Sequence, residues 1–387
     1  MQIKAKVVTE MAEKVLFPGD TIGIVGDSPN GIMMVAAAKR LGFKVIVCGS
    51  NESSPTMQAA DVRIVGTSKE KLQDFAERCD LITYESQYVP ASVIEFLSRF
   101  TAVPQGKDTL EITQDRLLER AFFEQINVNI APYATIVSLD DIYQSVSSIG
   151  FPCILKPIQK DINNKHQAVI KRQTDIAKVA DIVDLGTYVL ESLISFNKEI
   201  SVVFSRDYDG ELKFFPLTEE VYHGHDLNRV LTPARVTNDV EEEIHRLAHQ
   251  IAENINYVGV MQLSFYLTDS GSLYVKRMVP AVSPTGYVFD KATLVSMFEQ
   301  HLRVLARMPL MTTELVEPTA MVMMTDDDQD SIRTQWVLKD NWSYNFFRYP
   351  ERMKPRPAGY VLVTAPTIDA AEEQIQATEI WPDETSE

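Results

Sequence analysis

Three charged residues stand at the ends of apolar, strand-like segments, where side chains with these charges could hold a nucleotide. Lys156 closes the run CILK, Glu191 closes YVLE, and Glu199 opens EISVVF. A cleft between two lobes could use a lysine for phosphate oxygens and carboxylates for ribose hydroxyls or an adenine amino group. Each residue alone is more often a plain charge at a strand end, so the three predict a nucleotide site only as a set.

A glycine-flanked turn, GDSPNG at residues 26–31, closes the first strand-like run and opens a helix. Backbone N–H groups and the helix dipole favour an anion at such a place. The turn is not a P-loop, because Ile32 and Met33 stand where Lys and Ser or Thr belong, nor does it spell GxGxxG. Two readings stay open: a tight strand-to-helix turn, and a site for a ligand phosphate.

Two pairs of histidines are candidate metal ligands. His245 and His249 are four residues apart on a predicted helix and could share a metal, but Arg246 stands where a metalloprotease has its Glu. We therefore expect a solvated helix face there. His223 and His225 flank a glycine, and we expect them to be ordinary polar residues of a loop.

An acidic run at residues 326–330 is similar to a calcium-binding loop. The sixth position of such a loop needs a glycine, and Ser331 stands there instead. The run therefore predicts an exposed acidic turn.

The first third of the chain alternates strand-like and helical segments from Thr21 onward. The runs TIGIVG, KVIVCG and DLITYE are separated by amphipathic stretches such as SKEKLQDFAERC. This pattern predicts a parallel sheet covered by helices, with ligands at the carboxyl ends of the strands. We expect this Rossmann-like domain to span residues 1–112.

Two further units follow. Residues 114–127 predict a helix that leads into a small α+β lobe, residues 113–206, in which Ser138 and Asp141 form a capping box. Residues 207–387 hold longer strands, two of which we expect to be joined across the turn 269–271. A final segment, with GYVLVTA and IDAAEEQIQA, is expected to pack back on this domain as a small β-rich piece.

Composition restricts the classes of partner. The 387 residues carry a formal net charge of −17, which repels a polyanion such as a nucleic acid, while small phosphorylated ligands remain possible. There is no apolar run long enough to span a bilayer, so no membrane partner is expected. The odd number of widely spaced cysteines, Cys48, Cys79 and Cys153, suits reduced thiols and predicts a cytoplasmic protein.

Taken together, the segments resemble the N5-carboxyaminoimidazole ribonucleotide synthetases, a purine-biosynthetic family of ligases with the ATP-grasp fold. The likeness extends from about Pro18 to Ala365. The stretches that carry it are PGDTIGIVG, the YExxxVP of residues 84–90, EITQDRLLER, the LExxxxFxxEISV of residues 190–202, NYVGVMQLSFYL and SMFEQHLRVL. The resemblance implies an ATP-grasp fold that combines α/β and α+β parts, a homodimer, and carboxylation of aminoimidazole ribonucleotide with ATP and bicarbonate.

The resemblance also implies which residues hold ATP. Arg116 and Lys156 would face the phosphates, the segment from Glu191 through Ser192 and Leu193 to Ile194 would hold adenine, and Glu199 would bind ribose. Tyr222 takes the place of a family histidine. Lys165 and Gln167 are what remains of a glycine-rich loop, approximately GGYDGKGQ in the family, which reads KDINNKHQ at residues 160–167 here. Side chains in place of glycines obstruct the approach of backbone amides to phosphate.

The positions of the family's metal ligands have changed chemistry. Ser264 and Arg277 stand where the family has glutamates, and Lys276 replaces an asparagine. Magnesium prefers hard anionic oxygens, whereas Ser264 offers a neutral hydroxyl and Arg277 a fixed cation. The sequence therefore predicts no metal ligand at these positions and ATP bound without magnesium.

The implied site for aminoimidazole ribonucleotide is altered too. Gly26, Gly31, Glu85 and Arg356 are its remaining candidates, but Asp27 would lie near an expected phosphate. The family's RKMGH reads RPAGY at residues 356–360, so one basic residue is missing. The family's metal-site segment NEIAPRPHNSGH reads KRMVPAVSPTGY at residues 276–287.

Three hypotheses follow. The leading one is a diverged, weakly active or inactive member of the family that keeps nucleotide binding and serves as a binding or regulatory partner, with no residue assigned as catalytic. The alternative is an active ligase that acts on the family substrate or another amine and holds magnesium through Glu219 or Glu220. A purely structural subunit, the third, would have no affinity for nucleotides.

Overall fold

The computed structural model describes residues 14–160, 166–348 and 357–381. Its first part is a four-stranded parallel sheet of order β3-β2-β1-β4, as the alternation predicts. The strands are β1 (Thr21–Val25), β2 (Lys44–Gly49), β3 (Val62–Val65) and β4 (Leu81–Tyr84). The helices around them are α2 (Pro29–Arg40), α3 (Pro55–Ala59), α4 (Lys69–Glu77) and α5 (Ala91–Leu97).

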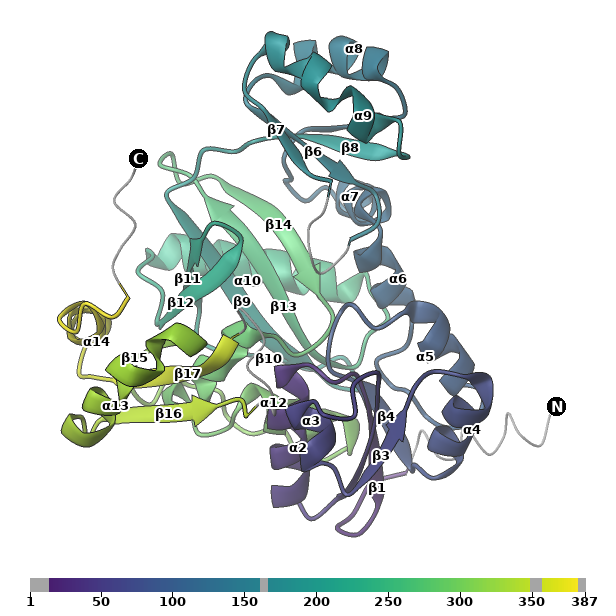
Figure 1. Ribbon diagram of the computed structural model, residues 1–387, viewed down its shortest axis with the longest axis vertical. Coiled ribbons are helices and arrows are strands. Elements are labelled where there is room, and N and C mark those ends of the chain that lie inside the picture. The colour runs from purple at the N-terminus through teal and green to yellow at the C-terminus, as the bar shows by residue number, and fades with distance from the viewer. Residues whose placement is uncertain (1–13, 161–165, 349–356, 382–387) are drawn as a thin grey trace.

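A small lobe stands apart from the rest of the molecule, at the top of Figure 1. Its antiparallel sheet has the order β5-β8-β6-β7. Helix α6 (Asp108–Gln114) and helix α7 (Arg116–Gln125) lead up to it. Its elements are β5 (Tyr133–Ile136), α8 (Leu139–Ile149), β6 (Cys153–Pro157), β7 (Ala168–Ile170), the 3₁₀ helix η1 (Gln173–Val179), α9 (Ala180–Val183) and β8 (Tyr188–Ser192).

Local capping explains where two of these helices begin. Ser138 accepts a hydrogen bond from the Asp141 N–H while the Asp141 carboxylate accepts one from the Ser138 N–H, which confirms the predicted capping box at α8. The Asp115 carboxylate caps α7 by accepting bonds from the N–H groups of Leu117 and Leu118. Arg116 is thereby fixed as the first residue of α7.

An antiparallel, nine-stranded sheet forms the centre of the molecule, with the order β14-β13-β9-β11-β12-β15-β17-β16 and β10 beside β9. Its strands are β9 (Lys198–Arg206), β10 (Leu212–Phe214), β11 (Thr218–His223), β12 (Asp226–Thr232), β13 (Gly259–Leu267), β14 (Leu273–Val279), β15 (Thr319–Thr325), β16 (Trp342–Phe346) and β17 (Pro357–Thr364). The antiparallel pairing of β13 with β14 confirms the predicted hairpin. Strand β9 pairs with β11 and β13 in this sheet. Its segment EISVVFSR was expected among the longer strands of the third unit, although the predicted boundary at residue 206 lies after it.

The remaining helices cover this sheet. They are α10 (Asn238–Glu253), η2 (Pro284–Val288), α11 (Phe289–Ala292), α12 (Met297–Leu305), η3 (Asp326–Asp328), α13 (Gln329–Leu338) and α14 (Ile368–Gln376). The C-terminal segment packs back as expected, because β17 pairs with β15 and the apolar side of α14 is buried against these strands. The division of the chain at residues 112 and 206 stays a prediction.

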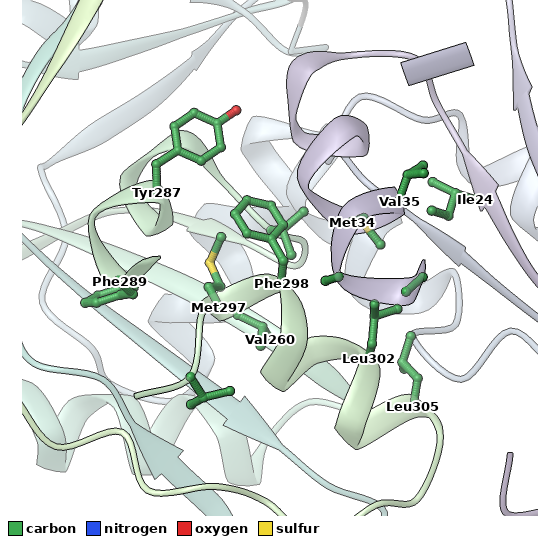
Figure 2. Packing of buried hydrophobic residues seen from close by; sticks show 14 of the residues in the cluster. Ile24, Met34, Val35, Val260, Tyr287, Phe289, Met297, Phe298, Leu302 and Leu305 are labelled. Carbon is green, nitrogen blue, oxygen red and sulfur yellow. The ribbon is translucent and has the colours of Figure 1, made fainter. Parts of the chain in front are cut away.

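One apolar core joins the N-terminal sheet to the central one. Figure 2 shows Met34 and Val35 of α2 facing Phe298 and Leu302 of α12, with Tyr287 of η2 nearby. All five residues are buried. Because burying such side chains stabilises by roughly 1.5–3 kcal/mol each, this core fixes how the two sheets lie relative to each other.

Three further expectations concern the cysteines, membrane-spanning helices and the acidic run. The cysteines Cys48, Cys79 and Cys153 are buried free thiols, as expected. Within the described ranges, no helix is both long and apolar enough to cross a membrane. The acidic run of residues 326–330 forms a capped turn, in which Asp328 accepts hydrogen bonds from Thr325.

The expectation for the helical histidines was wrong in part. His245 is half-buried and its ring lies against Phe214, with centroids 4.7 Å apart, while the exposed His249 contacts the same ring. Apolar contact with Phe214, rather than solvation, explains the position of His245. Burial lowers the pKa of His245.

Candidate functional site

A cavity of about 320 Å³ lies between the small lobe and the central sheet, within the size range of ligand pockets. Strands β6 and β8 supply one wall, and β9, β11, β13 and β14 supply the other. Nine of the ten residues expected to hold ATP line it: Arg116, Lys156, Gln167, Glu191, Ser192, Leu193, Ile194, Glu199 and Tyr222. The tenth, Lys165, lies outside the described residues. The structure therefore brings the set together, and its role toward ATP stays a prediction.

Glu191 is the centre of the small-lobe wall. Its two carboxylate oxygens accept hydrogen bonds from Lys156 Nζ at 2.7 Å and Arg120 Nε at 2.9 Å. Burial alone would raise the pKa of Glu191, but the positive charges of Arg120 and Lys156 outweigh it and hold the pKa far below its usual range. Glu191 is therefore an ionised side chain that is already paired with two cations.

Arg116 holds the segment that follows β6. Its guanidinium Nη1 donates to the carbonyls of Pro157, at 2.7 Å, and Gln159, at 3.3 Å. Burial lowers the pKa of Arg116, while Glu191 and Glu119 oppose the effect. Arg116 lines the cavity, and its guanidinium has further N–H donors from which an anionic group could accept.

A second buried carboxylate, Glu119, links α7 to the loop after β6 and to the central sheet. Lys160 Nζ lies 2.6 Å from Glu119 Oε2, and the Met278 N–H donates to Glu119 Oε1. Burial lowers the pKa of Lys160 to about 8. Lys160 and Arg120 line the cavity but were missed as candidates. For Arg120 a signal existed, because it is four residues from Arg116 and so shares its helix face.

The wall formed by the central sheet carries a lysine in contact with two aromatic rings. Lys276 Nζ lies 2.5 Å from Glu199 Oε2. The same nitrogen is 4.5 Å from the centroid of Tyr222 and 5.4 Å from that of Tyr266. The ring of Phe196 stacks on Tyr266 with centroids 4.5 Å apart, and both rings line the cavity. Phe196 and Tyr266 lie in segments that carried the resemblance but were not singled out.

Ser264 and Arg277 lie directly opposite each other on β13 and β14. Ser264 is fully buried, and its hydroxyl oxygen accepts hydrogen bonds from Ser201 at 2.9 Å and Gln262 at 3.1 Å. Arg277 Nη2 donates to the Tyr222 hydroxyl at 2.8 Å. The two positions are thus occupied by a hydrogen-bonded hydroxyl and a guanidinium.

Glu220 is the carboxylate nearest to this pair, and its oxygens are occupied. One accepts from Gln262 and Thr285, each at 2.7 Å, and the other accepts from Tyr222 at 2.8 Å. Burial alone would raise the pKa of Glu220. The positive charge of Arg277, 4.0 Å away, is the main influence that lowers it.

The neighbouring Glu219 points away from the cavity. It binds Lys198 at 2.9 Å and Arg235 at 2.7 Å. Within the described parts of the chain, no group of three or more His, Cys, Asp or Glu side chains is placed to hold a metal ion.

Of the two histidines expected in a loop, His223 is the last residue of β11, and only His225 lies in the turn. His225, expected to be an ordinary loop residue, lines the cavity together with Gly224, at the turn between β11 and β12.

The candidates for a second substrate meet at the carboxyl end of the parallel sheet. Gly26 has φ +116°, and a Cβ there would lie 2.1 Å from Glu85 Oε1. Glu85 in turn accepts hydrogen bonds from the Ser28 N–H and hydroxyl. A Cβ on Gly31 would lie 2.3 Å from Thr56. Side chains of the protein itself therefore fill the space next to both glycines.

Asp27 is bound to the segment that follows β2. One of its carboxylate oxygens accepts hydrogen bonds from the Ser50 N–H and hydroxyl and from the Asn51 N–H.

Burial raises the pKa of Glu85 to about 7. Arg356 lies outside the described residues.

Two tyrosines stack face to face beside this region. The rings of Tyr287 and Tyr360 have centroids 4.5 Å apart and planes inclined by 8°. Both are buried within the core of Figure 2, and the Tyr287 hydroxyl donates to Asn30 at 2.7 Å. These residues stand where the resemblance places the last histidines of NSGH and RKMGH.

Comparison with known sequences places these features in a family. The ATP-grasp domain family matches residues 121–298, and the ribonucleotide synthetase preATP-grasp domain family matches residues 20–114. The N5-carboxyaminoimidazole ribonucleotide synthase of Bacillus subtilis (strain 168) is 31% identical over 354 residues, covering 91% of this chain and 93% of that protein. The synthase of Staphylococcus saprophyticus is 27% identical and covers 92% of this chain and 96% of that protein.

Solved structures agree. The ADP complex of an N5-carboxyaminoimidazole ribonucleotide synthetase superimposes with a TM-score of 0.91 at 27% identity, over 95% of this chain and 98% of that one. The Staphylococcus aureus N5-carboxyaminoimidazole synthetase complexed with ADP gives 0.89 at 25% identity, over 95% and 99%. The expected ATP-grasp fold with an N-terminal parallel-sheet domain is confirmed.

Proposed function

Since the chain belongs to the family of N5-carboxyaminoimidazole ribonucleotide synthases, we propose that it is a diverged member that binds an adenine nucleotide between its lobes. Its activity as the ATP-dependent ligase that carboxylates aminoimidazole ribonucleotide in purine biosynthesis is weak or absent. It acts instead as a nucleotide-binding or regulatory partner.

The charge of the cavity supports nucleotide binding. Among the described residues, six lysines and arginines but only three carboxylates line it, in a chain whose formal net charge is −17. Positive charge gathered in one cleft of an acidic protein attracts a small anion. Relatives with the same fold have been solved with ADP.

We propose the following roles within the cavity. Arg116 and Lys156 bind phosphates, together with Lys165 and Gln167 of the following loop. The segment from Glu191 to Ile194 holds adenine, and Glu199 and Tyr222 lie beside the ribose and phosphates.

The observation that carries the divergence is the guanidinium of Arg277 opposite Ser264. A magnesium ion bound with nucleotide needs one or two carboxylates and near-octahedral oxygen ligands. The donor set here does not fit that ion, because the Ser264 hydroxyl already accepts two hydrogen bonds and Arg277 would repel a cation. Glu220 has no free oxygen, and Glu219 is directed toward Lys198 and Arg235.

The acceptor side supports the same conclusion. Gly26, Gly31 and Glu85 are packed against other side chains, and the Tyr287–Tyr360 stack occupies positions that are histidines in the family. Two buried aromatic rings leave little room or polarity for a ribonucleotide. We therefore propose that aminoimidazole ribonucleotide binds weakly or has been replaced by another ligand.

An active ligase is the second candidate. It is favoured by the cavity itself, which keeps Arg116, Lys156, Glu191 and Glu199 together. Such an enzyme would use the family substrate or a changed acceptor, and would draw magnesium through the nucleotide alone.

A steady-state assay decides between these functions. Purified protein is given ATP, bicarbonate and aminoimidazole ribonucleotide with magnesium, and ADP release is measured beside the Bacillus subtilis synthase as positive control. We expect turnover far below about 1 per second, whereas a rate of that order would show an active ligase. Thermal shifts with ATP and ADP complete the test, because a ligand bound only by the native state raises its apparent stability. No shift with either would favour a purely structural subunit.

We also propose a homodimer in the cytoplasm, without a nucleic-acid or membrane partner. Sedimentation of the purified protein tests the oligomeric state.

A further inference from the structure

Lys276 forms an ion pair with Glu199 and also lies where a bound anion could contact it. Its Nζ is 2.5 Å from Glu199 Oε2, with side-chain exposures of 20% and 10%. Both side chains line the cavity. An anion that enters the cavity therefore meets a lysine whose charge is already engaged.

The surroundings of Lys276 keep this pair exchangeable. The ammonium lies near the rings of Tyr222 and Tyr266, whose faces attract a cation without fixing its direction. Arg277, the next residue, also lines the cavity, and its positive charge repels the ammonium of Lys276. Burial, followed by Arg277, lowers the pKa of Lys276. A phosphate group, with more negative charge than a carboxylate, relieves this repulsion better than Glu199 does.

We propose that Lys276 is a phosphate-binding residue that Glu199 holds until a nucleotide enters, and that the phosphates then take over Lys276 and free the Glu199 carboxylate for the ribose hydroxyls. The proposal rests on the nucleotide function above and makes Lys276 the residue that distinguishes a phosphorylated ligand from a bare nucleoside. Only ion pairs are exchanged, so no bond is broken and no group transferred.

The exchange predicts opposite effects for the two members of one ion pair. Removing Glu199 releases Lys276, so inorganic pyrophosphate, which has no ribose, should bind more tightly to Glu199→Gln than to the wild type. Removing the ammonium in Lys276→Asn should weaken the binding of pyrophosphate and of ADP. If the ion pair were merely structural, both substitutions would change the affinity for pyrophosphate in the same direction.

The test is isothermal titration calorimetry of the full chain in EDTA, with adenosine, ADP and inorganic pyrophosphate as probes. Lys198→Asn is the matched control, because Lys198 forms a comparable pair with Glu219, at 2.9 Å and with exposures of 23% and 9%, outside the cavity lining. Melting temperatures without ligand show that each variant is folded. Should Lys276→Asn fail to fold, Glu199→Gln alone still gives the sign of the effect.

We expect Lys276→Asn to weaken ADP and pyrophosphate by about 10- to 100-fold and to leave adenosine unchanged, the range of one hydrogen bond to a charged group. Glu199→Gln should strengthen pyrophosphate by about tenfold, and Lys198→Asn should match the wild type. The role of Lys276 is wrong if pyrophosphate binds Lys276→Asn as tightly as the wild type, or if it binds Glu199→Gln more weakly than the wild type. Either result leaves the proposed nucleotide binding intact. A wild type that binds none of the probes overturns both.

Discussion

At the scale of single residues, the cavity differs from a magnesium-dependent site at one cross-strand pair. Ser264 and Arg277 are register partners on adjacent antiparallel strands. Side chains in such a pair have Cβ atoms about 4.5–5.5 Å apart, so two carboxylates there could share one ion. The proposed change from a metal site to a guanidinium would therefore need only two substitutions and no change of fold.

The reverse substitutions should restore dependence on the metal. In Ser264→Glu/Arg277→Glu we expect magnesium to strengthen ADP binding about tenfold or more, because two carboxylates replace a hydroxyl and a cation. Calorimetry with and without magnesium measures it. Ser264→Ala/Arg277→Ala, which removes the guanidinium without adding carboxylates, is the control. An equal magnesium effect in both variants would contradict the assignment of these positions.

Glu85 predicts a pH dependence of stability. Burial raises the pKa of Glu85 from an ordinary 4.5 to about 7, against the hydrogen bonds from Ser28. Between these values the folded protein holds a proton that the unfolded chain has released, so the stabilising contribution is lost as pH rises through this window. Glu85→Gln should therefore gain unfolding free energy relative to wild type from pH 4.5 to pH 7, on the order of 3 kcal/mol.

Urea unfolding at several pH values checks this. Exposed Glu52→Gln serves as the control and should follow the wild type. Parallel curves for wild type and Glu85→Gln would show that folding does not raise the pKa of Glu85.

At the scale of elements, α7 positions one wall of the cavity. Arg116, Glu119 and Arg120 lie on one face of this helix, and the Asp115 cap fixes where it begins. We expect Asp115→Ala to lower the unfolding free energy by about 0.5–2 kcal/mol and to weaken ADP binding. Ser138→Ala removes the cap of α8, which does not line the cavity, and should reduce stability similarly without affecting ADP. Equal ADP affinity in both variants would show that the start of α7 does not matter for the site.

The sequence predicted most elements because their signals are local. The parallel sheet, the β13–β14 hairpin and the capping box of Ser138 follow from alternation, turn residues and spacing, and each is present. The length and apolar character of the β9 segment grouped it with the other long strands, which it joins, while the predicted boundary at residue 206 was placed after it. Most of the residues expected to hold ATP were found through family position, and only Lys156, Glu191 and Glu199 were also indicated by their charges at strand ends.

What the sequence could not give is pairing over long distances. Lys276 and Glu199 are 77 residues apart, and Tyr287 and Tyr360 are 73 apart, so nothing local signals either contact. Arg120 and Lys160 were overlooked because a charge at a helix face or strand end usually meets solvent. Their burial follows only once the lobe lies over the central sheet.

At the scale of the whole molecule, the core around α2 and α12 should make the two sheets unfold together. Met34 is fully buried there. We expect Met34→Ala to cost about 2–5 kcal/mol and to preserve a single transition. All three tryptophans, Trp336, Trp342 and Trp381, lie in the C-terminal segment, so their fluorescence reports a change made in α2.

Fluorescence and circular dichroism should therefore give the same midpoint for Met34→Ala. Val337→Ala on α13, where the side chain is 82% exposed, is the control and should change stability by less than about 0.5 kcal/mol. Two separate transitions would show that the sheets fold independently.

The guanidinium between the lobes also has a physiological consequence. If nucleotide binds without magnesium as proposed, the positive counter-charge is covalently built into β14, and no divalent ion has to be recruited from the surroundings. The occupancy of the cavity would follow the concentration of free nucleotide and stay constant when the supply of magnesium fluctuates. Such a chain would register the energy state of a cell through the polyphosphate alone.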